Sequence, residues 1–134
     1  MKNFEEKILI WYNDENLNGK ENVMFYYTYM VRCEDNSLYT GMTSDLEKRI
    51  NEHISKAKNG AKYTKSHNAV KLEIAWRCRE KSLACKLEYQ IKQLNKKQKE
   101  KILLGERIST FLSGKVDCRR YRIEKINKKT FLVS

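Results

Sequence analysis

The sequence predicts an α/β fold, a small three-stranded, mainly antiparallel sheet flanked by helices. Three segments dense in aromatic and β-branched residues are typical of strands, and two segments carry apolar residues at the four-residue steps of a helix. At 134 residues, with no proline and five glycines, the chain shows no obvious linker. One domain with a modest core is therefore expected over residues 24–104, between extensions of residues 1–23 and 105–134.

The first two predicted strands form a hairpin. Residues 25–32 and 38–43 have strand composition, and residues 34–37 between them are turn formers. Tyr29 and Tyr39 share a face of this hairpin if the loop has an odd length, and lie on opposite faces if the loop has two residues. The sequence does not fix this register.

A helix is expected to follow the hairpin. Ser44 and Glu47 have the form of a capping box, and Leu46, Ile50 and Ile54 supply the apolar stripe of the helix.

The second half of the predicted domain contains a strand and two helices. Alternation over residues 70–78 places Leu72, Ile74 and Trp76 on one face of the third strand. Helices are predicted over residues 82–95 and 97–104. In the C-terminal extension, residues 121–126 and 130–133 are the arms of a possible small hairpin.

The charge of the chain favours a polyanionic partner. The formal net charge is +11, which points to nucleic acid first and to an anionic membrane surface second. No apolar run approaches the ~18 residues of a membrane span, and acidic residues interrupt the N-terminus where a signal peptide would need basic and apolar ones. A cytoplasmic protein that binds DNA rather than a membrane is expected.

Four residues in the first half of the chain could together cleave a phosphodiester. Arg49 and His53 lie four apart on one face of the predicted helix, where the guanidinium could hold a phosphate and the imidazole could move a proton. Tyr29 and Tyr39 could act as bases, although holding a phenolate at pH 7 costs about 4 kcal/mol. The alternatives are a solvated helix face for the first pair and ordinary strand packing for the tyrosines.

Glu88 is the best candidate for a metal ligand. A single carboxylate, with water and substrate phosphate completing the coordination shell, suits Mg²⁺; a surface ion pair is the alternative. Lys62, Tyr63 and Lys65, in the loop after the first helix, could bind nucleic acid through charge and base stacking.

The ordered set of these residues resembles the GIY-YIG nuclease family, and in particular its small standalone bacterial members. The resemblance implies metal-dependent hydrolysis of a DNA phosphodiester with Mg²⁺ or Mn²⁺. It implies that Arg49 contacts the phosphate, that Glu88 binds the metal, and that Tyr29 or Tyr39 activates water with help from His53. The residues that carry it are Tyr27-Thr28-Tyr29, Tyr39-Thr40-Gly41, Thr43, Arg49, His53 and Glu88.

The chain departs from the family pattern at two positions of these motifs. Tyr27 replaces the glycine of the first triplet, and Met42 stands where several family nucleases carry a lysine. A DNA endonuclease is the function predicted from the sequence, with the strandedness of the substrate open. A non-catalytic nucleic-acid-binding module is the alternative, favoured by the charge and by Met42.

Overall fold

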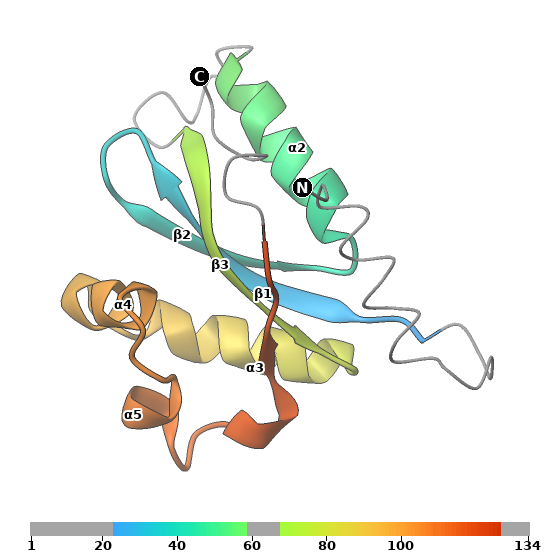
Figure 1. Ribbon diagram of the computed structural model, residues 1–134, viewed down its shortest axis with the longest axis vertical. Helices are drawn as coiled ribbons and strands as arrows, with labels where there is room; N and C mark the ends of the chain where they lie inside the picture. The colour runs from blue at the N-terminus through green and yellow to red at the C-terminus, as the bar shows by residue number, and fades with distance from the viewer. Residues whose placement is uncertain (1–22, 59–67, 127–134) are drawn as a thin grey trace.

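The computed structural model describes residues 23–58 and 68–126 (Figure 1). Residues 8–12 have a composition typical of a strand, and they lie outside these ranges, as do Lys62, Tyr63 and Lys65 with their predicted nucleic-acid contacts. Among the described residues, no helix combines the length and apolar character needed to cross a bilayer. The elements in chain order are β1 (Tyr26–Cys33), β2 (Leu38–Thr43), α2 (Leu46–Lys58), β3 (Ala69–Cys78), α3 (Lys81–Lys92), α4 (Lys96–Leu103), α5 (Ser109–Leu112), the 3-10 helix η2 (Cys118–Arg120) and β4 (Arg122–Ile123).

The predicted α/β fold class is confirmed. The sheet has the strand order β2-β1-β3-β4, and every pairing is antiparallel. Helix α2 covers one face, where Leu46 and Ile50 pack against Tyr29 and Val31 of β1. Helices α3, α4 and α5 lie on the other face (Figure 1). Strand β2 is therefore an edge strand with helices on both sides.

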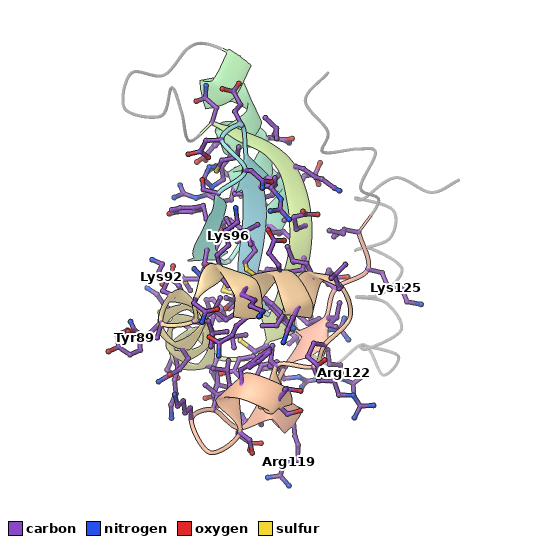
Figure 2. All side chains as sticks on the ribbon, turned by 90° about the vertical axis from the view of Figure 1, so that its left-hand side faces the viewer. Tyr89, Lys92, Lys96, Arg119, Arg122 and Lys125 are labelled. Carbon is purple, nitrogen blue, oxygen red and sulfur yellow. The ribbon has the colours of Figure 1, made fainter. Side chains whose placement is uncertain are left out.

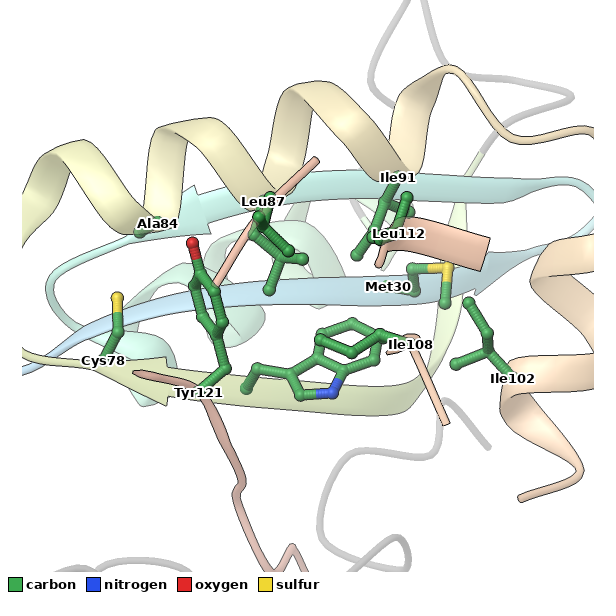
Figure 3. Close-up of a cluster of buried hydrophobic side chains, with 11 residues drawn as sticks. Met30, Cys78, Ala84, Leu87, Ile91, Ile102, Ile108, Leu112 and Tyr121 are labelled. Carbon is green, nitrogen blue, oxygen red and sulfur yellow. The ribbon is translucent and has the colours of Figure 1, made fainter. Parts of the chain in front are cut away.

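The second face holds a core cluster that includes residues from the C-terminal extension. Leu87 and Ile91 of α3 pack over Met30 of β1 (Figure 3), and Leu112 and Tyr121 from beyond residue 104 complete the cluster. The Tyr121 hydroxyl donates a hydrogen bond of 2.7 Å to the carbonyl of Leu83. The division of the chain at residue 104 stays a prediction, but the described part of the extension shares this core.

Over residues 23–58 and 68–126 the sheet has four strands, one more than predicted. Residues Arg122–Ile123 form β4 and pair with β3, through Trp76↔Ile123 and Arg77↔Arg122. The sequence prediction paired this segment with residues 130–133, which lie outside the described part of the chain. Two-residue strands carry too little periodicity for their partner to be read from sequence.

The predicted alternation of β3 is wrong between Leu72 and Ile74. Met30 pairs with Ile74 but Val31 pairs with Leu72, so Glu73 is an extra residue in the ladder. A bulge of one residue moves the following side chains to the opposite face. Leu72 consequently packs on the α2 face, whereas Ile74 packs on the α3 face.

Helix α2 begins one residue later than the capping box at Ser44 predicts. Its first residue is Leu46. The Asp45 carboxylate accepts a hydrogen bond of 3.1 Å from the amide of Lys48, and the Thr43 hydroxyl accepts one of 3.0 Å from the amide of Asp45. Asp45 therefore occupies the capping position predicted for Ser44.

Candidate functional site

The hairpin register places Tyr29 and Tyr39 on one face of the sheet. Tyr29 lies opposite Gly41 and Val31 lies opposite Tyr39, so all four residues point to the α2 side. Asn36 makes this register possible, because its φ of 69° is in the left-handed region that a tight turn requires and that asparagine tolerates. The question left open by the sequence is thereby answered.

The Tyr29 hydroxyl joins two site residues from α2. Its oxygen lies 3.0 Å from Nε2 of His53 and accepts a 3.3 Å hydrogen bond from Nε of Arg49. Arg49 and His53 are one helical turn apart, which lets both reach the same phenol. The tyrosine itself is 0% exposed, so its hydroxyl is fixed by packing as well as by these bonds.

Gly41 leaves the space that the Tyr29 ring occupies. A Cβ atom at position 41 would lie 2.5 Å from the Tyr29 hydroxyl oxygen and 2.7 Å from its Cζ atom. Because any side chain at this position would collide with the ring, the glycine of the second triplet is required by the tyrosine of the first.

Tyr39 is the exposed tyrosine of the site. Its side chain lies at the sheet edge with 42% of the residue accessible to solvent. The His53 ring meets it edge-on, with ring centroids 5.5 Å apart, and Nζ of Lys92 lies 6.0 Å from the ring centroid. Residues from α2 and α3, on opposite faces of the sheet, thus meet at Tyr39.

Glu88 approaches the same edge from α3. Its carboxylate lies 3.6 Å from Nζ of Lys92, one turn along the helix. Glu88 is also close enough for its negative charge to contribute to raising the pKa of Tyr29. Lys92 therefore links the carboxylate to the Tyr39 ring.

Burial dominates the acidity of Tyr29. Removal from solvent raises the pKa of the phenol above its usual value, while the hydrogen bond from Arg49 opposes that rise. A standing phenolate at Tyr29 near pH 7 is consequently unfavourable.

The structure brings Tyr29, Tyr39, Arg49, His53 and Glu88 to one edge of the sheet. The sequence interpretation did not include Lys92 in this site, although its spacing of four residues from Glu88 predicts contact between the two side chains on a helix. It also missed the steric role of Gly41, which depends on the register.

The donor set at this edge fits a hard divalent cation. Among the described residues there is no group of three or more His, Cys, Asp or Glu side chains that could hold a metal ion. Glu88 offers one carboxylate, partly exposed, with solvent and substrate able to supply further oxygens. Mg²⁺ is commonly bound in this way, by one or two carboxylates together with water and phosphate oxygens.

The chain is similar to known proteins over most of its described length. The GIY-YIG catalytic domain family model matches residues 25–101. UPF0213 protein FN1575 of Fusobacterium nucleatum is 47% identical over 103 residues, which cover 77% of this chain and 99% of that protein. UPF0213 protein DP2720 of Desulfotalea psychrophila is 45% identical over 78 residues, covering 58% of this chain and 70% of the relative.

A solved structure is also similar. The solution NMR structure of the UPF0213 protein BH0048 from Bacillus halodurans is 35% identical, covers 66% of this chain and 95% of its own, and has a TM-score of 0.41.

All five residues at the β2 edge fall inside the range of the family model, whereas α5, η2 and β4 lie beyond it. That model spans more than half of the chain, and the Fusobacterium relative is matched over nearly its whole length. The protein therefore belongs to the GIY-YIG family of nuclease-like catalytic domains, with the bacterial UPF0213 proteins among its relatives.

Proposed function

We propose that the protein is a metal-dependent endonuclease that hydrolyses DNA phosphodiester bonds at the β2 edge. The observation that supports this best is the meeting of Tyr39, Arg49, His53 and Glu88 around one exposed edge, in a chain of the GIY-YIG family. The net charge of +11 supplies the attraction for a polyanionic substrate.

Arg49 is the residue proposed to hold the scissile phosphate. Its guanidinium is oriented by the Tyr29 hydroxyl and by Glu52, whose carboxylate lies 3.3 Å from Nη1. Its side chain remains 39% exposed, so a phosphate can reach it. A guanidinium fixed in this way can form paired hydrogen bonds to phosphate oxygens and stabilise the charge that develops during attack.

Tyr39 is the tyrosine proposed to contact the attacking water. Tyr29 is fully buried and already bonded to Arg49 and His53, whereas Tyr39 faces solvent beside the same imidazole. His53 is the group nearby that can take up a proton close to neutral pH, so no phenolate has to persist.

Tyr29 then serves to hold His53 in place through the reaction. With the neutral ring protonated at Nε2, that N–H donates a hydrogen bond to the Tyr29 oxygen and Nδ1 can take up a proton; the protonated ring keeps the same Nε2–H bond. The 3.0 Å separation between the Tyr29 oxygen and Nε2 of His53 suits both states. The ring therefore keeps its orientation when its charge changes.

Glu88 is proposed to hold Mg²⁺ or Mn²⁺ beside this site. When bound, such a cation would polarise the phosphate and stabilise the leaving oxygen. Lys92 lies next to the carboxylate and can balance its charge in the absence of a cation.

Cleavage of labelled single-stranded and double-stranded DNA with Mg²⁺ or Mn²⁺ tests the proposal. The wild type should yield product, and Glu88→Gln should abolish it while keeping the shape of the side chain. Glu106→Gln is the matched control, since Glu106 is an exposed acid that bonds Thr110 rather than the site. Binding without product in the wild type would favour the non-catalytic module instead, and equal cleavage by Glu88→Gln would reject the metal role.

A further inference from the structure

A second basic site lies at the end of the sheet away from the hairpin turn. It is a cavity of about 200 Å³ where β1 begins, β3 ends and β4 begins. This volume is below the ~300–1,000 Å³ of pockets that enclose a whole small molecule, so it suits a single group such as a phosphate. Its walls are formed by Phe25, Arg77, Arg79, Arg119, Arg120 and Arg122.

Contacts with a buried ring and a strand pairing position part of the wall of this arginine pocket. Arg77 and Arg79 lie over the buried Phe25 ring, with their guanidinium carbons 5.6 Å and 6.0 Å from its centroid. Arg122 is brought beside Arg77 by the β3–β4 pairing. The pocket therefore depends on β4 and η2, both of which lie beyond the range of the family model.

Five of the residues that line the pocket are arginines. Carboxylates accompany several of them: Asp117 lies 3.1 Å from Arg119, Glu80 lies 3.4 Å from Arg120, and the charge of Arg77 acts on the buried Glu124. Arg119 remains 90% exposed, and pairs this accessible to water hold an arginine only weakly. Such a cluster matches the planar, paired hydrogen bonding that phosphate accepts from arginine.

The part of the pocket formed by Arg77 and Arg122 lies on the same side of the sheet as the candidate site, whereas Cys118 of η2 packs in the cluster on the α3 face. Thr43 of β2, Tyr27 of β1, Arg77 of β3 and Arg122 of β4 are successive partners in one row across the strands. Tyr29 lies two residues from Tyr27 and points to the same face. Strand β4 is three strand spacings, or about 14 Å, from β2, and Tyr39 lies four residues, or about 13 Å, along β2 from Thr43. The two places are therefore about 19 Å apart, which corresponds to roughly six nucleotides along one DNA strand.

We propose that the arginine pocket binds a backbone phosphate of the same DNA that enters the β2 edge, several nucleotides from the scissile bond. This rests on the proposed function for its ligand, and it assigns the C-terminal extension a part in substrate binding. Figure 2 shows Arg119 at the lower end of the molecule and Arg122 on the side opposite Tyr89 and Lys92. Contacts at both places would lengthen the footprint of the protein on DNA.

Binding of a fluorescently labelled 20-base-pair duplex, measured by anisotropy at several salt concentrations without divalent metal, tests this proposal. Arg119→Ala/Arg122→Ala removes two exposed guanidiniums and should weaken binding on the order of tenfold or more at 0.1 M salt. Each lost phosphate contact lowers the slope of log K against log salt by about 0.9, so loss of the one phosphate held by the pocket should make the slope shallower by about 0.9. Arg119→Lys/Arg122→Lys keeps the charges and should keep most of the slope.

Arg107→Ala/Lys115→Ala is the matched control, since it removes the same charge from two exposed residues outside the pocket. Equal affinities and salt slopes for the pocket variant and this control would overturn the proposal, as would a wild type that does not bind the duplex. A selective loss in the pocket variant supports it whether or not DNA is cleaved. Nuclease activity of the wild type is scored separately, so the failure of one proposal is distinguished from the failure of the other.

Discussion

Replacing Gly41 with alanine should both destabilise the protein and disturb the candidate site. The added methyl carbon would lie 2.5 Å from the Tyr29 hydroxyl oxygen, inside any normal contact distance. Tyr29 is fully buried, so its ring has no solvent-filled space into which it can move. Relief of the clash requires a shift of the ring or of β2, and either shift changes the bonds from Tyr29 to Arg49 and His53.

The size of the effect follows from the cost of an overpacked core. Inserting one methyl group into a well-packed interior costs about 1–3 kcal/mol. For a chain of this length each kcal/mol corresponds to about 4 °C in Tm, so a fall of about 4–12 °C is expected. Displacement of a catalytic group by about 1 Å can cost on the order of 100-fold in rate, so cleavage should fall by more than stability alone explains.

Urea denaturation and DNA cleavage of Gly41→Ala, Tyr29→Phe and the double variant measure this directly. Tyr29→Phe removes the oxygen at 2.5 Å but keeps the Cζ atom at 2.7 Å, so the double variant should recover part of the loss caused by alanine. The two substitutions should therefore be non-additive, as expected for residues in contact. Wild-type stability in Gly41→Ala, or strict additivity in the double variant, would refute this account.

Three further results are expected. Tyr39→Phe should lower the cleavage rate about 100-fold or more with little change in the urea midpoint. Tyr29→Phe should lower both the cleavage rate and the urea midpoint. A large loss of rate at unchanged stability in Tyr29→Phe, with little effect of Tyr39→Phe, would assign the water contact to Tyr29 instead. Arg32→Gln should cost about 1–3 kcal/mol in urea denaturation, because the Glu73 carboxylate, 9% exposed and 2.8 Å from Arg32, would stay buried with only the more exposed Lys71, 3.3 Å away, as its cation. Joint replacement of Arg32 and Glu73 by methionine should cost less, and an equal loss would contradict the explanation. Burial raises the pKa of Glu124, so the folded state keeps this proton to a higher pH than the unfolded chain does. The free energy of unfolding should therefore fall as pH rises from about 4.5 through the raised pKa. Glu124→Gln should remove this part of the fall in Tm measured over a pH series, and an unchanged pH profile would contradict the assignment to Glu124.

The sequence allowed the hairpin and both principal helices to be predicted because their signals are local. Leu46 and Ile50, and likewise Leu87 and Ile91, are four residues apart and all are buried as expected. The bulge at Glu73 could not be predicted in this way, because alternation continues through it in the sequence while the pairing with β1 does not.

The composition of the candidate site was predictable in part. The chain order of tyrosine, arginine, histidine and glutamate pointed to these residues before their positions were known. Their separate functions depend on facts that only the fold supplies: Tyr29 is buried, Tyr39 is exposed, and Lys92 lies between Tyr39 and Glu88. The arginine pocket had no sequence signal, because its members are assembled by the pairing of β3 with β4.

The position of β2 at the sheet edge explains how one site can use helices from opposite faces. Inside a sheet, a strand would separate α2 from α3 by the full thickness of the backbone layer. At the edge, His53 of α2 and Lys92 of α3 can both approach Tyr39. The Thr28 hydroxyl fixes α3 against β1 through a 2.8 Å hydrogen bond to the carbonyl of Ala84, one turn before Glu88. A substrate phosphate that reaches Tyr39 would therefore meet groups from both helices, which a tyrosine buried under α2 could not offer.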